Sequence, residues 1–440
     1  MGVMLLFPEV WNKQHEGIET KMEKVAKLTM DDKKKLPFRT VLRFLGPGFL
    51  VTVGFIDPGN WATNIEGGSK YGYDLLWVIT LSTIMLIIIQ NMSARLGIAT
   101  GKSLAVNIRE NFSRPVVYLL GITIVLACVA TDVAELLGGA IGFNLLLGTP
   151  LWLGAFITVV FEVVMIISLR YHRLEAAIIG FLAIIGICYI IEILIVKPDW
   201  ALLAPALVIP RVNSSSIYVA MGILGAVVMP HNIFLHSNVI HSREWGNSEE
   251  GKKKLLKYEK IDTSVAMIMG WIVNSAMIIV AAAVFARHGI AVDSIEQASE
   301  TLKPLAGPLA GFLFALALVF AGVGSSVTSS MAEVNVITGF LGKPEDPRTF
   351  LYKISVFITA VPSFFIIMSG MDTFRILIFS QVVLSIQLPF TLIPLLILCR
   401  KGGIMASFRS DTKEFCAAVL ISAIVIALNL YLLYSTVTGE

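Results

Sequence analysis

The chain has 440 residues, of which 56% are hydrophobic and 15% charged, with a formal net charge of +3 and a mean hydropathy of +0.80. A soluble domain carries about 25% charged residues, so this composition excludes an ordinary soluble enzyme and a nucleic-acid-binding protein. Apolar runs of about 20 residues, the length that crosses a bilayer, recur along almost the whole chain. The sequence therefore predicts an all-α polytopic membrane protein.

Eleven membrane spans are expected, centred near residues 58, 86, 128, 160, 184, 228, 274, 320, 359, 386 and 425. Residues 1–45 should form a cytoplasmic N-terminal tail, 46–400 the transmembrane core, and 401–440 a cytoplasmic loop followed by the eleventh span. With the N-terminus inside, the cytoplasmic segments hold 28 of the 34 Lys and Arg. The positive-inside rule then places the C-terminus outside. The compact length is typical of bacteria, so a bacterial plasma membrane is expected.

The most basic inner segment, residues 243–260, is expected to be a loop between the sixth and seventh spans. Its Lys and Arg side chains favour contact with anionic membrane lipids, and we interpret it as a topology anchor.

Two short motifs interrupt apolar spans at equivalent places. Asp57-Pro-Gly-Asn60 lies in the first span and Met229-Pro-His-Asn232 in the sixth, 172 residues apart, and both have the form x-Pro-x-Asn. Each opens a set of five spans, and five spans invert the topology. The pair therefore predicts inverted repeats over about 46–197 and 215–400, with a binding site between them near the membrane midplane.

The prolines of these motifs explain how such a site forms. Pro58, followed by Gly59, and Pro230 each remove backbone hydrogen bonds from the helix. Carbonyls near Ile56 and Ala226 are then expected to be free to face a ligand. Half-helix ends with negative dipole charge suit a cation.

The side chains of the two motifs indicate which cation. Asp57 offers an anionic oxygen, Asn60 an amide oxygen and Met229 a thioether. Mixed oxygen and sulfur ligation suits Mn²⁺, Fe²⁺, Co²⁺ or Cd²⁺ better than Ca²⁺ or Mg²⁺. In the tenth span Gln381 and Gln387 lie on different helix faces, and either one completes this set or only bridges helices.

These residues resemble the Nramp (natural resistance-associated macrophage protein) family of divalent transition-metal transporters. The resemblance extends over essentially the whole chain, through the two motifs and through stretches such as 46–50, 95–101 and 130–135. It implies a LeuT-type fold with an inverted repeat over the first ten spans. It further implies metal ligands at Asp57, Asn60, Met229, the Ala226 carbonyl and, in some states, Gln381, with no cofactor beyond the metal carried as substrate.

The resemblance also implies that a proton moves with the metal. Candidate carriers are Asp57, His231 and the pair Asp132 and Glu135, which lie three apart and therefore on one helical face. Ionisable groups inside a membrane are functional candidates. His231 is equally well explained as a neutral side chain bonded to a neighbouring helix.

Three positions depart from the family pattern. Val125 stands where many members carry another acid, and Ser355 and Val356 stand where many carry adjacent arginines. The function expected is import of divalent transition metals by alternating access with proton co-transport. An uncoupled divalent-metal carrier that also accepts Mg²⁺ is the alternative, and an organic-substrate or sodium symporter is disfavoured because Asp57 would repel a substrate carboxylate.

Overall fold

The computed structural model describes residues 46–213, 215–243 and 248–438, and every regular element in these ranges is a helix. The tail expected over residues 1–45 lies outside the described residues.

In chain order the α-helices are α3 (Pro47–Gly54), α4 (Pro58–Tyr71), α5 (Leu76–Thr100), α6 (Leu104–Asn111), α7 (Arg114–Leu147), α8 (Leu151–Ser168), α9 (Tyr171–Val196), α10 (Trp200–Ala206), α11 (Ser216–Val227), α12 (Pro230–Val239), α13 (Glu249–Val284), α14 (Ile295–Ala306), α15 (Pro308–Leu341), α16 (Phe350–Met368), α17 (Thr373–Arg400), α18 (Gly402–Met405) and α19 (Thr412–Thr438). Three short 3₁₀ turns are η1 (Ile240–Ser242), η2 (Ala286–His288) and η3 (Ala406–Phe408).

The membrane spans agree with the prediction. Within the described residues, ten helices or helix pairs are long and apolar enough to cross a bilayer. The broken pair α3 and α4 supplies the eleventh span, and every expected centre falls on one of these helices or at the break between a pair.

The basic segment differs from its prediction as a loop, because α13 already begins at Glu249. Ser248 caps this helix by accepting a hydrogen bond from the Gly251 amide at 3.1 Å. Glu249 and Lys253 then form an i,i+4 ion pair of 2.6 Å on its surface, a spacing that favours helix. Most of residues 243–260 are therefore the first turns of the seventh span.

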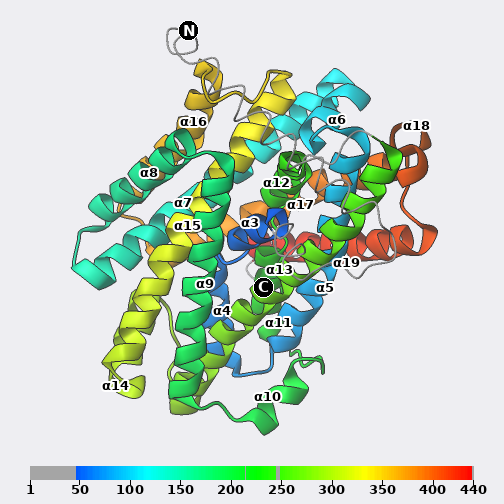
Figure 1. Cartoon of the computed structure of the whole chain (residues 1–440). Coiled ribbons are helices and arrows are strands. Elements are labelled where there is room, and N and C mark those ends of the chain that lie inside the picture. The colour runs from blue at the N-terminus through cyan, green and yellow to red at the C-terminus, as the bar shows by residue number, and fades with distance from the viewer. Residues whose placement is uncertain (1–45, 214, 244–247, 439–440) are drawn as a thin grey trace, which may run out of the picture. The chain divides into compact units, whose positions relative to one another are not determined.

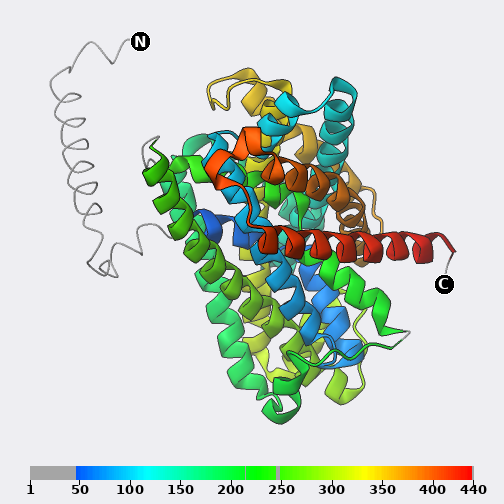
Figure 2. The same ribbon diagram turned by 90° about the vertical axis from the view of Figure 1, so that its right-hand side faces the viewer.

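The broken helix α3 lies in the middle of the bundle, with α9, α12, α13 and α15 in contact with it (Figure 1). The long helices α7 and α15 pack along each other, and α8, α16 and α17 pack on α7. In both views α6 and α18 lie at one end of the bundle and α10 and α14 at the other (Figures 1 and 2). These two ends are the expected cytoplasmic and outer sides.

A close approach brings α7 against the first helix break. A Cβ atom on Gly138 would lie 1.9 Å from Cγ of Pro58, so only glycine lets α7 reach this point. Small residues at helix contacts in membranes have this effect generally. The helix break is thus packed directly against α7, which carries the candidate proton residues.

Candidate metal-binding site

The first break separates α3 from α4 by three residues, and Asp57 is the N-cap of α4. Its carboxylate accepts hydrogen bonds from the amides of Gly59, at 3.0 Å, and Asn60, at 3.2 Å. These bonds follow from the sequence, because Asp before Pro at the first helical position is a strong helix start. They hold the carboxylate at the positive end of α4.

The second break separates α11 from α12, and Met229 is the N-cap of α12. Asn60 joins the two breaks, because its Nδ2 donates to the carbonyl of Ala226 at 3.2 Å and to Asp57 Oδ1 at 2.5 Å. Residues 166 apart in the chain are thereby brought into contact. The Met229 side chain is fully buried three residues after Ala226, and its sulfur accepts from Asn232 Nδ2 at 3.7 Å.

One glutamine of α17 also reaches this place. Gln381 Nε2 donates to Asp57 Oδ2 at 3.2 Å, whereas Gln387 Oε1 accepts from Thr391 in its own helix at 2.9 Å. The structure therefore separates the two candidates that the sequence left open. Asp57, Asn60, the Ala226 carbonyl and Gln381 form one contact set.

This set contains oxygen atoms that lack partners. Asn60 Oδ1 and Gln381 Oε1 are buried and have no hydrogen-bond partner in the described part of the chain. Buried polar atoms are normally satisfied, so these two oxygens suit a cation placed beside Asp57. No cluster of three or more His, Cys, Asp or Glu able to hold a metal occurs among the described residues. The candidate site is therefore the contact set of carboxylate, amide and carbonyl oxygens, and Met229, whose sulfur contacts Asn232, lies at the same helix break as Ala226.

The backbone carbonyls at the first break are occupied. The carbonyl of Ile56 accepts from the indole of Trp61 at 3.1 Å. A carbonyl oxygen has two lone pairs, so the expectation that this carbonyl faces a ligand stays a prediction. The carbonyl of Phe55 accepts from Asn60 and from Asn274 on α13, at 3.2 and 3.0 Å. Side-chain donors thus replace the helix bonds that the break removes, and Ala226 is the carbonyl that lies at the contact set.

The candidate proton residues lie on the neighbouring α7 and α12. His231 is fully buried, and its Nδ1 lies 3.3 Å from Thr131 Oγ1. Asp132, the next residue on α7, accepts from Ser329 of α15 at 3.1 Å. Glu135 is fully buried, and neither of its oxygens has a partner among the described residues.

The positions that depart from the family pattern place no base near these acids. Ser355 donates to the carbonyl of Leu351 in its own helix at 2.8 Å. Val356 is fully buried and Val125 partly buried. Within the described ranges, no ion pair joins Asp132 or Glu135 to a Lys, Arg or His.

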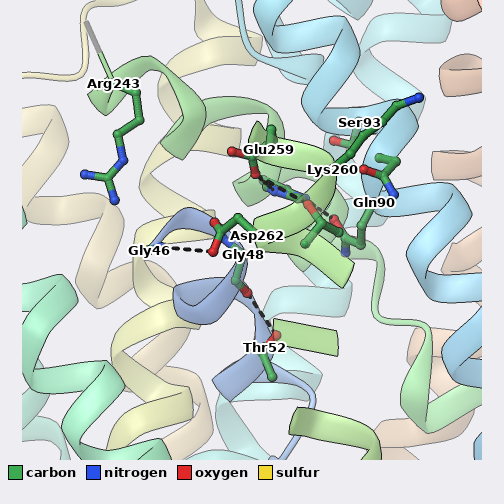
Figure 3. Close-up of polar contacts among 12 residues, drawn as sticks. Gly46, Gly48, Thr52, Gln90, Ser93, Arg243, Glu259, Lys260 and Asp262 are labelled. Atoms are coloured by element: carbon green, nitrogen blue, oxygen red, sulfur yellow. Dashed lines mark hydrogen bonds and ion pairs between the residues drawn. The ribbon is translucent and has the colours of Figure 1, made fainter. Parts of the chain in front are cut away.

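A further polar group at the N-terminal end of α3 was not predicted. Asp262 of α13 accepts from the amides of Gly46 and Gly48, at 3.0 and 2.7 Å (Figure 3). On the neighbouring turn, Glu259 meets His236 Nε2 at 2.7 Å. The Asp262 contacts tie the start of α3 to α13, and the Glu259 contact ties α12 to α13. The sequence signal for Asp262 was available, since α13 is otherwise uncharged beyond residue 260.

Comparisons with known proteins show the family of the chain. Residues 48–435 match the family described as Natural resistance-associated macrophage protein-like, Nramp. The chain is 41% identical to the divalent metal cation transporter MntH of Caldanaerobacter subterraneus subsp. tengcongensis, over 92% of this chain and 96% of that protein. It is 39% identical to the divalent metal cation transporter MntH of Bacillus subtilis, over 92% of this chain and 95% of that protein.

Solved structures show the same architecture. A manganese transporter of Eremococcus coleocola superimposes with a TM-score of 0.82 at 28% identity, over 92% of this chain and 90% of that one. Mhp1, a nucleobase-cation-symport-1 family transporter, superimposes with a TM-score of 0.58 at 14% identity, over 89% of this chain and 93% of that one. The second similarity concerns the fold alone, and together they confirm the LeuT-type fold with broken first and sixth spans.

Proposed function

Because the chain belongs to the Nramp family, we propose that it is a secondary transporter that imports divalent transition-metal ions, Mn²⁺ and Fe²⁺ among them, across a bacterial plasma membrane. The observation that supports this most is the contact set at the two helix breaks. Asn60 there bridges Asp57 and the Ala226 carbonyl, and two buried amide oxygens have no partner.

In this proposal the metal exchanges its water shell for protein atoms between the two repeats. Asp57 supplies the only negative charge of the set, Asn60 and Gln381 supply amide oxygens, and Ala226 supplies its carbonyl. The Met229 thioether is a soft ligand that Ca²⁺ and Mg²⁺ do not favour. Selectivity for transition metals then comes from sulfur, and attraction comes from the carboxylate.

Alternating access would move the helices around this fixed site. The bundle opens to each side in turn, with the N-terminus in the cytoplasm and the C-terminus outside. Asp262, which holds the two amides at the start of α3, is one contact that has to break when the first span moves away from α13. A proton is carried with the metal through Asp57, His231, Asp132 and Glu135.

An uncoupled carrier that also accepts Mg²⁺ is the second candidate. The observation that favours it is the absence, among the described residues, of a base paired with Asp132 or Glu135, where Ser355 and Val356 replace the arginines of many relatives. Retention of Met229 favours transition metals in both cases.

The test is Mn²⁺ influx into proteoliposomes, with internal pH recorded at the same time and excess Mg²⁺ outside. Acidification that follows Mn²⁺ entry supports coupled import, and entry without acidification supports the uncoupled carrier. Strong competition by Mg²⁺ would contradict the selectivity proposed for Met229. Liposomes that contain Asp57→Ala provide the control for leak.

A further inference from the structure

Four carboxyl groups are buried together beside the metal pathway. Asp132 and Glu135 lie on α7, Glu162 on α8 and Glu333 on α15, and none is more than 1% exposed. Within the described ranges no Lys, Arg or His forms an ion pair with any of them. Four uncompensated negative charges in a membrane interior are far too unfavourable to coexist. Some of these four carboxyl groups must therefore be neutralised, either by bound protons or by a bound cation.

The hydrogen bonds around Ser329 favour bound protons. The Ser329 hydroxyl lies 3.1 Å from Asp132 Oδ1 and 3.3 Å from Glu333 Oε1. A hydroxyl has one proton and donates fully to only one of them, and a proton on the other carboxyl group gives the second contact its own donor. Asp132 of α7 and Glu333 of α15 thus share the Ser329 hydroxyl, which places their carboxyl groups side by side.

Glu162 of α8 approaches α15 at Ser330, the residue after Ser329. Its Oε1 accepts from Ser330, while Glu333 accepts at Oε2 from Thr359 of α16. The second oxygens of Glu162 and Asp132 are buried and have no hydrogen-bond partner in the described part of the chain. Two further acceptor atoms are thus available to protons in this region.

The position of these groups follows from the sequence of α15. Glu333 lies four residues after Ser329, so both side chains are on one helical face, and Ser330 is turned toward α8. Within the described residues, the ionisable groups around Glu333 are Asp132 and Cys128 of α7 and Glu162 of α8. Ser329 and Ser330 of α15 therefore bind carboxyl groups, whereas Ser325 and Ser326 donate to carbonyls of their own helix.

We propose that Asp132, Glu333 and Glu162 form a proton-binding site in which Glu333 exchanges the transported proton with Asp132. This inference rests on the proposed proton-coupled import. Glu333 then has the role of a second carboxyl partner for Asp132 where the arginines of many relatives are absent. A metal ion is the less suitable occupant, since no three acidic, His or Cys groups of the described chain converge as metal ligands.

The experiment compares Glu333→Gln with Glu192→Gln in proteoliposomes. Glu192 of α9 is a matched control, because it is fully buried, has no partner for either oxygen among the described residues and lies outside the network. Mn²⁺ binding by the purified protein, Mn²⁺ influx and protons taken up per Mn²⁺ are measured for each. We expect Glu333→Gln to keep Mn²⁺ binding and to lose most of the proton uptake per Mn²⁺, and Glu192→Gln to behave as the unmodified chain.

Infrared difference spectra between acidic and alkaline pH give a second readout that needs no transport. A carboxylic acid C=O band present in the unmodified chain should be lost in Glu333→Gln and kept in Glu192→Gln. Unchanged proton uptake and an unchanged band in Glu333→Gln would overturn the proposal, as would a cation-binding signal that this substitution alone removes. Failure of the unmodified chain to bind or carry Mn²⁺ would instead contradict the proposed function, so the two failures are distinguishable.

Discussion

The substitution Gly59→Ala tests the geometry of the metal site through a single methyl group. A Cβ atom at position 59 would lie 1.6 Å from Nε2 of Gln381 and 2.8 Å from Oδ2 of Asp57. To reach the 3.4 Å of an ordinary contact, the Gln381 amide has to retreat by about 1.8 Å, which breaks its present 3.2 Å bond to Asp57. Alanine itself favours a helix over glycine, so the fold should survive.

The expected loss follows from the contact removed. An amide that interacts with a charged group contributes about 1.5 kcal/mol at the lower end of the usual range, so Mn²⁺ affinity should fall about tenfold. Isothermal titration of the purified protein measures this, and Gly222→Ala is the control. A Cβ atom at position 222, one turn before Ala226, meets only Thr63 Cγ2, at 3.8 Å.

A double-mutant cycle gives the decisive comparison. Gln381→Ala should weaken Mn²⁺ binding to a similar degree. Adding Gly59→Ala to it should cost less than Gly59→Ala alone, because the Gln381 amide is already gone and only the 2.8 Å contact with Asp57 Oδ2 remains. Fully additive losses would refute the reasoning, since the methyl group would then act on something other than Gln381. Unchanged Mn²⁺ affinity in Gly59→Ala would refute it as well.

Three other predictions concern the site and the topology. Asp57→Ala should abolish Mn²⁺ uptake while the protein still elutes as a folded species in size-exclusion chromatography, because the set loses its only charge; residual uptake near the unmodified level would contradict the assignment. Met229→Ala should reduce discrimination against Ca²⁺ and Mg²⁺ more than it reduces Mn²⁺ uptake, measured by competition in proteoliposomes, and unchanged discrimination would exclude the thioether as the source of selectivity. An epitope added after Glu440 should be reached by antibody on intact cells, and one added before Met1 only after permeabilisation; the opposite result would invert the proposed topology.

The fold could be predicted well because each membrane span is determined by features of its own local sequence. Apolar length gives the helices, and Pro58 and Pro230 mark both breaks, whereas the orientation inferred from the excess of Lys and Arg on one side stays a prediction. The basic segment 243–260 was predicted less well, because Ser248 and the Glu249–Lys253 pair extend α13 by local interactions that a count of positive charges does not register.

The residue types of the candidate site could be predicted from the sequence, but some of its contacts could not. Asp57, Asn60 and Gln381 lie in contact, whereas the hydrogen bond from the Trp61 indole to the Ile56 carbonyl could not be predicted, because the indole has to fold back over the break. Rings of Tyr189 and Phe314, at 5.4 and 5.2 Å, hold that indole in place. Such a contact depends on the packing of three helices and leaves no local pattern.

Glu333 was not among the functional residues predicted from the sequence. It is an acid inside a long apolar helix, which is by itself a sign of function, yet it follows a run of small polar residues that resembles ordinary helix packing. The contacts of Glu333 depend on how α15 packs against α7, α8 and α16, because its neighbours Asp132 and Thr359 lie 201 and 26 residues away in the chain. Only the assembled bundle brings them together.

The central claim is that a transition metal binds where the two broken helices meet, and anomalous diffraction from crystals soaked in Mn²⁺ tests it most directly. The structure predicts one anomalous peak within ligand distance of the Asp57 carboxylate, the Asn60 amide and the Met229 sulfur, and no such peak in crystals of Asp57→Ala. A peak confined to the carboxyl groups of Asp132, Glu162 and Glu333, or an unchanged peak in Asp57→Ala, would contradict the account.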